Sequence, residues 1–371
     1  MLKKLIKVCK SETVLVIAFL LAVVSSFVNP PGKHYLEYID FRVLGLLLAL
    51  MLVMAGLQKN KVFFKLGEKL IMKCSSIRTL AAVLVFLCFF SSMLLTNDVA
   101  LITFVPFALL TLRMTDMEQF LIPIVTAQTI AANLGSMLTP MGNPQNLYLY
   151  GLSGLSMSGF LGLMFPYALM SALLLFVCVL LLKNEKLELP EFAEETKIER
   201  VSQVMMYGLL FVVCLLCVLH VFEWQLVLLT VIVAVFIMDK KVMLLADYGL
   251  LLTFICFFIF IGNMGEIPAV REMLATLIQG RECMVAVLSS QVISNVPAAI
   301  LLSGFTTDYT ALIIGTNLGG LGTLIASMAS LISYKQLANA YPEQKSGYFK
   351  YFTLMNVIFL IALWGMYMLI G

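Results

Sequence analysis

The sequence is poor in charged residues and in the side chains that bind metals. Only 12% of its 371 residues are Asp, Glu, Lys or Arg, against about 25% in soluble domains. It has two histidines, and its eight cysteines include one CxxC, at Cys214 and Cys217, without a second to pair with it, which argues against a metal centre. It has no Gly-rich phosphate loop ending in Lys-Ser/Thr, which argues against an ATP-driven pump. The apolar runs also contain no pair of acidic residues and no His placed to activate a Ser, which are the groups that an enzyme within the membrane would use. We therefore do not expect an enzyme.

Long apolar runs make up most of the chain. Hydrophobic residues account for 61% of the sequence, and the mean hydropathy is +1.02. A membrane-spanning helix needs about 17–25 such residues, and runs of this kind occupy roughly 12–28, 40–57, 159–182, 203–220, 224–238, 245–262 and 350–370. The first run follows Lys3, Lys4, Lys7 and Lys10, a flank that fits a signal peptide or, as we expect, a first membrane helix. We predict an all-α integral membrane protein.

Two further regions, 77–112 and 281–305, carry a polar group in the middle of apolar sequence. The groups are Thr96-Asn97-Asp98 and Ser294-Asn295-Val296-Pro297. The apolar arms beside them are about 10–15 residues long, too short to span about 30 Å at 1.5 Å per residue. We therefore predict two re-entrant helical hairpins with Asn97 and Asn295 at their tips. Each tip residue is also suited to cap the helix that follows it.

Two other regions, 117–150 and 307–335, are long enough to span but are interrupted by Pro, Gly and Asn. The first reads Asn-Leu-Gly-Ser-Met-Leu-Thr-Pro-Met-Gly-Asn-Pro-Gln-Asn, and the second repeats Asn-Leu-Gly-Gly-x-x-Thr. Proline cannot continue a helix, and Gly135 and Gly142 permit positive φ, so we predict two broken helices. Unwinding frees carbonyl oxygens that suit Na⁺, and nearby helix N-termini suit anions. The alternatives are a Pro-kinked helix in the first region and close helix packing at glycine in the second.

Polar residues at these four places are the candidate transport site, because unpaired polar groups are costly inside a bilayer. The predicted substrate-binding residues are Thr96, Asn97, Asn143, Gln145, Ser294, Asn295, Pro297, Asn317 and Thr323. The predicted ion-coupling residues are Asp98, Asn133, Gly135, Thr139, Gly142, Asn146 and Gly319. Asp98 is the single acid that we place deep in the membrane, and the second hairpin has Val296 at the matching position. We expect Asp98 to carry Na⁺ or H⁺; its alternative role is a helix cap.

Positive charge predicts the topology. With a cytoplasmic N-terminus and hairpins that do not cross, the cytoplasmic loops hold every Lys and Arg except Lys33, Arg42, Arg271 and Arg281, and the C-terminus is external. The same order of elements then occurs in 1–182 and, upside down, in 224–371. A polar linker at 183–202 and one connecting helix at 203–223 separate these inverted repeats. The first hairpin opens to the cytoplasm and the second to the outside.

Between the second helix and the hairpin of each repeat lies an amphipathic stretch, at 61–73 and at 268–278. Apolar and charged residues alternate there at helical spacing, which suits a helix on the membrane surface. We interpret each stretch either as an arm that braces a moving unit or as a plain interfacial linker.

These motifs resemble the ion transporter superfamily, which includes divalent anion/sodium symporters, citrate–metal and arsenite permeases and one group of sodium/proton antiporters. The resemblance covers nearly the whole chain and is most specific at 97–101, 135–146 and 290–297. It implies a homodimer in which a static scaffold holds a mobile unit that moves by an elevator mechanism. Both tips and both unwound helices would form the site. Dicarboxylate symporters have Ser-Asn-Thr at both tips, so Asp98 makes the first tip look more like the arsenite-permease and antiporter branches.

The sequence thus predicts a secondary transporter of the bacterial inner membrane. Its substrate would be a small anion or oxyanion, either a carboxylate or an arsenite-like species, coupled to Na⁺ or H⁺. The alternative is a sodium/proton antiporter with Asp98 as the exchanged site, and a channel is a further rival. We expect membrane lipid and the transported solute as partners and no nucleic acid. Beyond bound Na⁺, no cofactor is expected.

Overall fold

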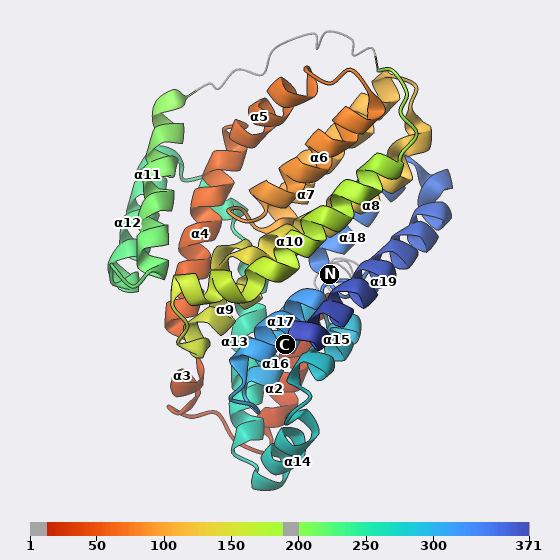
Figure 1. The fold of residues 1–371 in the computed structure, drawn as a ribbon. Coiled ribbons are helices and arrows are strands. Elements are labelled where there is room, and N and C mark those ends of the chain that lie inside the picture. The colour runs from red at the N-terminus through yellow and green to blue at the C-terminus, as the bar shows by residue number, and fades with distance from the viewer. Residues whose placement is uncertain (1–12, 188–199, 371) are drawn as a thin grey trace.

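A computed structural model describes residues 13–187 and 200–370, which are almost entirely helical (Figure 1). The first half contains α2 (Thr13–Ser26), α3 (Tyr35–Tyr38), α4 (Phe41–Lys59), α5 (Val62–Ile71), α6 (Ile77–Ser91), α7 (Asn97–Met114), α8 (Leu121–Gly135), α9 (Pro144–Ser153) and α10 (Met157–Leu181). The second half contains α11 (Val201–Val218), α12 (Trp224–Asp239), α13 (Tyr248–Gly265), α14 (Pro268–Ile278), α15 (Glu282–Ile293), α16 (Asn295–Ser303), α17 (Tyr309–Leu318), α18 (Met328–Ala340) and α19 (Lys345–Ile370). Short 3-10 turns are η1 (Glu118–Phe120), η2 (Ser136–Leu138), η3 (Pro140–Gly142), η4 (Val242–Leu245) and η5 (Pro342–Gln344). The N-terminal lysines and most of the predicted linker lie outside the described residues.

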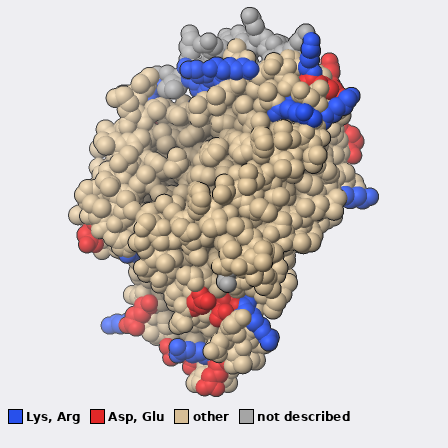
Figure 2. Space-filling model, viewed as in Figure 1, with Lys and Arg blue, Asp and Glu red and all other residues tan. Residues whose placement is uncertain are grey.

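Length and apolarity make the described helices suitable for a bilayer. Within residues 13–187 and 200–370, seven segments are long and apolar enough to cross a membrane. On the face drawn in Figure 2, charged side chains gather at the two ends and a broad band between them has few. The end that carries α5 is rich in Lys and Arg (Figures 1 and 2). This distribution is that of an integral membrane protein.

The order of elements in the first half recurs in the second. Each half has two long helices, an amphipathic helix, a helical hairpin, a broken helix and a final long helix. The amphipathic helices are α5 and α14, as predicted. The hairpins are α6–α7 and α15–α16, and the broken helices are α8–α9 and α17–α18. The first helix of each half packs on the second helix of the other half: α2 contacts α13, and α12 contacts α4.

The helices form two packed groups. In the first group, α4 packs against α11 and α12, and the Lys59–Asp239 ion pair joins α4 to α12. In the second group, α6 packs on α8 and α15 on α17, while α7 contacts α18 and α9 contacts α16. Buried hydroxyls hold this second group together: Thr129 of α8 donates to Ser333 of α18 at 2.7 Å, and Tyr348 of α19 lies 3.3 Å from both. α5 is packed between the groups and touches α4, α6 and α7.

The hairpin arms differ from the sequence prediction at one place. α6, α15 and α16 are short, with 15, 12 and 9 residues. The expectation of about 10–15 residues is wrong for α7, which has 18 residues and continues through Pro106 to Met114. A single proline bends or weakens a helix without ending it when tertiary packing supports both sides, and Phe104 and Phe107 beside Pro106 are fully buried.

Candidate functional site

The two hairpin tips are built alike. At the first tip Asn97 begins α7, and its Oδ1 accepts a hydrogen bond from the backbone N–H of Asp98 at 2.9 Å. At the second tip Asn295 begins α16, and its Oδ1 accepts from Val296 N at 3.0 Å. Both asparagines are buried, and the side-chain oxygen of each satisfies a backbone N–H at the start of its own helix. The amide nitrogens remain available for contacts beyond the hairpin.

Asn133, near the C-terminal end of α8, connects the first tip to the other half of the chain. Its Oδ1 accepts from Asn97 Nδ2 and from Ser327 Oγ, both at 3.0 Å, and its Nδ2 donates to Ser330 Oγ at 3.1 Å. Ser327 and Ser330 lie at the start of α18. One buried amide therefore joins a hairpin tip, the first broken helix and the second broken helix.

Asn317, near the end of α17, makes the matching connection in the opposite direction. Its Nδ2 donates to Asn146 Oδ1 at 2.6 Å, and Asn146 is the third residue of α9. Ser330, the partner of Asn133, is likewise the third residue of α18. Each Asn-Leu-Gly asparagine thus bonds the corresponding position in the other half. These crossed bonds fix the two breaks against each other.

The first break is closed by its own polar residues. Asn143 Nδ2 donates to Ser136 Oγ at 2.7 Å, and Ser136 Oγ donates to the carbonyl of Asn133 at 2.9 Å. Asn146 Nδ2 lies 3.3–3.4 Å from the carbonyls of residues 136, 137 and 139. Thr139 donates to the Met93 carbonyl near the first tip. Carbonyls of the unwound segment therefore point at side-chain amides rather than along a helix, as predicted for a broken helix.

The glycines of the broken helices allow close contacts because they have no side chain. Gly135 and Gly142 do not use the positive φ that glycine permits, and Gly135 has φ −67°. A Cβ at Gly135 would collide with the carbonyl of Phe89, and one at Gly142 with the carbonyl of Ser136. Gly319 is equally close to Ser290. In the second break it is Gly322 that takes positive φ, at 105°.

The second break is held by Gln291, which sequence reasoning did not select. Gln291 Nε2 donates to the carbonyls of Gly319 at 3.1 Å and Leu321 at 2.9 Å, and its Oε1 accepts from Thr323 N at 2.9 Å. Thr323 itself is exposed and bonds back to the Gln291 carbonyl, so the structure places it outside the buried cluster. Ser294 has φ 74°, a backbone conformation that is strained for a residue other than glycine.

Several buried polar atoms near the breaks have no hydrogen-bond partner in the protein. Among the described residues these include Asp98 Oδ1, Asn317 Oδ1 and both amide atoms of Gln145, a side chain with no exposed surface. Buried polar groups nearly always find a partner, since an unmade bond costs about 1–3 kcal/mol. These atoms are therefore available to an ion, a solute or water.

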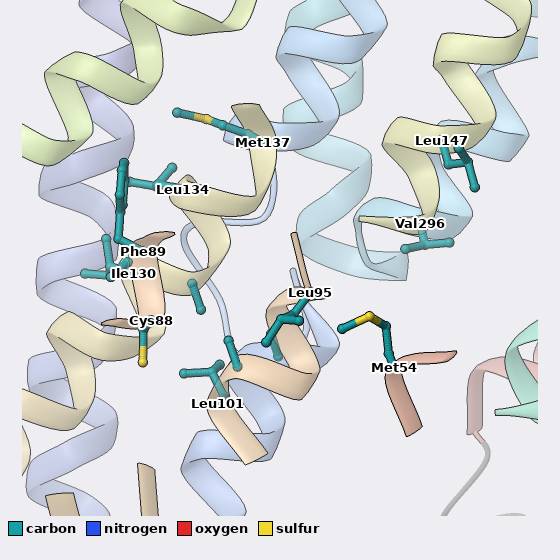
Figure 3. Packing of buried hydrophobic residues seen from close by; sticks show 14 of the residues in the cluster. Met54, Cys88, Phe89, Leu95, Leu101, Ile130, Leu134, Met137, Leu147 and Val296 are labelled. Carbon is teal, nitrogen blue, oxygen red and sulfur yellow. The ribbon is translucent and has the colours of Figure 1, made fainter. Parts of the chain in front are cut away.

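A cavity of about 240 Å³ lies beside the first tip, between the two helix groups. Its polar lining consists of Thr96, Asp98 and Asn143 on one side and of Gln58 and Asp247 on the other. The remaining lining is apolar and includes Met51, Met54 and Met328. Figure 3 shows Met54 of α4 facing Leu95 at the tip, while Val296, the residue that matches Asp98, belongs to the buried apolar cluster. The two tips therefore differ in the way that the sequence predicted.

The structure brings most of the predicted residues together and adds others. Asn97, Asn133, Asn143, Asn146 and Asn317 form one hydrogen-bonded set, and Thr96 and Asp98 line the adjoining cavity. Ser294, Asn295 and Pro297 are buried at the second tip, where Asn295 N donates to the Ala326 carbonyl at 3.0 Å. Residues that sequence reasoning missed are Ser136, Gln291, Ser327, Ser330 and Asp247. The two serines could have been found, because their spacing after the second break equals that of Asn143 and Asn146 after the first.

Comparison with known proteins places this arrangement in a family. The family model described as Citrate transporter matches residues 5–308. The chain belongs to this family. The resemblance to the ion transporter superfamily is thereby confirmed, and the chain is a multi-pass membrane transporter of the citrate and arsenite permease type.

Three curated relatives illustrate the range of the family. The chain is 32% identical to the Inner membrane protein YbiR of Escherichia coli over 321 residues, 84% of each chain. It is 31% identical to the Uncharacterized transporter MJ0456 of Methanocaldococcus jannaschii, over 85% of this chain and 86% of the relative. A shorter match, 34% identical, covers 33% of this chain and 25% of the Silicon efflux transporter LSI3 of Oryza sativa.

Proposed function

We propose that this member of the citrate transporter family is a secondary active transporter of a small anion or oxyanion in the bacterial inner membrane, coupled to Na⁺ or H⁺. The main support is the meeting of the first tip with both broken helices at Asn133, beside a cavity lined by Asp98. Amide and carbonyl oxygens are suitable ligands for Na⁺, and Asp98 supplies a negative charge with an unpaired oxygen. The proposed site comprises the predicted residues except Thr323, together with Ser136, Ser327 and Ser330.

We propose further that residues 1–182 and 224–371 are inverted repeats with re-entrant hairpins. The repeated element order, the crossed packing of α2 on α13 and α4 on α12, and the crossed asparagine bonds all support a two-fold relation in the membrane plane. The Lys-rich end near α5 would be cytoplasmic by the positive-inside rule. The N-terminus would then be cytoplasmic and the C-terminus external.

The two helix groups support an elevator mechanism. The group that contains both hairpins and both broken helices would move as one body, because its elements share buried hydrogen bonds such as Tyr148 to Ser303 at 2.8 Å and Thr129 to Ser333. The group built on α4, α11 and α12 would be the static scaffold, and in a homodimer it would hold the partner. α5 and α14 connect the groups and would act as the arms.

Asp98 restricts how an anion can bind. A carboxylate or oxyanion near an ionised Asp98 is repelled, and the cavity lining contains no Lys, Arg or His among the described residues. A bound Na⁺ or H⁺ at Asp98 would remove that repulsion. We therefore propose that the cation binds first and the anion second.

The alternative function is sodium/proton exchange at Asp98. The observation that favours it is the same unpaired Asp98 oxygen in a cavity without cationic side chains in its described lining. In that case the hydrogen-bonded set of asparagines would serve only to hold the two broken helices together.

Counterflow in proteoliposomes separates these functions. Vesicles preloaded with citrate, succinate, arsenite or silicate should accumulate the labelled form of one of these solutes, saturably and only with Na⁺ or a pH gradient. Asp98→Asn should abolish the ion dependence, and Thr323→Val, outside the cluster, should keep it. Na⁺/H⁺ exchange without counterflow of any solute would establish the antiporter. Non-saturable flux without counterflow would indicate a channel.

A further inference from the structure

The cavity beside the first tip contains a second carboxylate, Asp247, that the proposed function does not use. Asp247 stands at the start of α13, which packs on α2 and contacts both α4 and α16, whereas Asp98 stands at the start of α7 in the group that would move. Both line the same cavity of about 240 Å³. Asp247 is exposed and Asp98 is partly buried, and two carboxylates that line one mostly apolar space repel each other unless a cation lies with them.

One oxygen of Asp247 is engaged locally and the other is not. Its Oδ1 accepts a hydrogen bond from Leu250 N at 2.9 Å and so caps α13. Its carboxylate takes part in neither of the salt bridges found in residues 13–187 and 200–370. Asp98 lines the same space, and its Oδ1 is buried without a hydrogen-bond partner. The geometry therefore leaves carboxylate oxygens of both groups for one small cation.

This space has a neighbouring cavity on the side of α5. A second cavity, of about 280 Å³, shares Gln58 and Ile102 with the first and is also lined by Lys61 and Thr103. Gln58 stands at the junction, where its amide oxygen can accept a cation in transit. Lys61 is the cationic group of this second cavity, among the described lining residues, and lies beyond the junction from Asp98.

The other half of the chain has the same carboxylate at the opposite end. Asp40 caps α4 in the way that Asp247 caps α13: its Oδ1 accepts from Val43 N at 2.9 Å. A short helical turn precedes each cap, α3 before Asp40 and η4 before Asp247. α4 and α13 are the second helices of the two halves, so Asp40 and Asp247 are matched positions of the two halves.

We infer that Asp247 is a relay for the coupling cation: it binds Na⁺ or H⁺ arriving from the α5 end and raises cation occupancy at Asp98. Asp40 has the same role for a cation arriving from the opposite end, once the mobile group has moved. This inference rests on the proposed coupling role of Asp98 and adds two residues to it. A single mobile carboxylate would meet a fixed one at each end of its path.

The test measures cation occupancy at Asp98 without a transported solute. Purified protein in detergent is treated with dicyclohexylcarbodiimide, which modifies protonated carboxyl groups in apolar sites, and labelling of the Asp98 peptide is measured by mass spectrometry. Protection by increasing Na⁺ at fixed pH, and labelling against pH without Na⁺, distinguish the two cations. Because Asn caps helices as well as Asp does, Asp247→Asn removes the charge and keeps the cap.

We expect Asp247→Asn to raise the Na⁺ concentration for half-protection roughly three- to tenfold, or to shift the pH midpoint correspondingly if the cation is H⁺, since it removes one nearby charge. Asp247→Glu should restore the value. Asp308→Asn, which removes a capping carboxylate at the start of α17, should leave it unchanged. Equal protection of Asp247→Asn and the wild type would overturn the inference.

Transport by vesicles of known orientation separates this inference from the proposed function. If Asp98→Asn keeps ion-driven counterflow, the proposed coupling is wrong. If Asp98→Asn loses it but Asp247→Asn shows no change in cation dependence with the cation on the α5 side, only the relay is wrong. The relay further predicts that Asp40→Asn weakens the cation dependence from the opposite side alone.

Discussion

Replacing Asn133 with alanine tests whether one amide holds the two breaks together. The side chain makes three hydrogen bonds of 3.0–3.1 Å, to Asn97, Ser327 and Ser330. At about 1–2 kcal/mol for each buried partner left without a bond, Asn133→Ala should cost about 3–5 kcal/mol of unfolding free energy. Counterflow should be lost as well, because the first tip is no longer tied to α8 and α18.

Asn356→Ala is the matched control. Asn356 of α19 is also fully buried, but its Nδ2 donates only to the Phe352 carbonyl of its own helix, at 2.8 Å, and its Oδ1 has no partner. The same atoms are removed, so the cost of the space they leave is similar, while the hydrogen-bond loss should be no more than about 1 kcal/mol. Reversible unfolding in mixed micelles measures both. If Asn133→Ala is no more destabilising than Asn356→Ala, then Asn133 does not hold the tip and the two broken helices together.

Three further variants test single features of the site. Gly135→Ala should destabilise by about 1–3 kcal/mol because its methyl group meets the Phe89 carbonyl, whereas Gly162→Ala, with no atom near, should be neutral or stabilising in the same assay; equal effects would contradict the close approach. Ser294→Gly should raise stability by about 1 kcal/mol by relieving positive φ, and a loss would mean that the hydroxyl contributes more than its two 3.4 Å contacts suggest. Gln145→Leu should raise stability, since neither amide atom has a partner, and should abolish solute counterflow; unchanged counterflow would remove Gln145 from the site.

Local chemistry made the elements of the site predictable from sequence. Pro140 and Pro144 cannot continue a helix, and the structure breaks the helix between Gly135 and Pro144. The glycine-rich stretch after Asn317 is likewise non-helical up to α18. The tip asparagines begin α7 and α16 as expected. In each case the signal lies within a few residues of the feature that it determines.

The remaining features depend on residues far apart in the chain. Nothing near Asn133 indicates that its partners are Ser327 and Ser330. A sequence cannot distinguish a glycine needed for its backbone angle from one needed for a close approach, and Gly135 is of the second kind. Asp247 was missed because, at the start of an apolar run, it has the pattern of an ordinary helix cap, and only the cavity shows that it faces Asp98.

The crossed asparagine bonds also have a consequence for how the protein is made. Asn133 has two of its partners, Ser327 and Ser330, at the start of α18, and Asn146 receives a bond from Asn317, so both breaks have bonds that only the other half of the chain can supply. At roughly 5–20 residues per second, the ribosome needs on the order of 10–40 s to proceed from Asn133 to Ser330. During that interval the first half lies in the membrane with buried amides that lack their final partners. The first half is therefore a dependent folding unit that becomes native only when the second has been inserted, and the two halves expressed as separate chains should accumulate together but not alone.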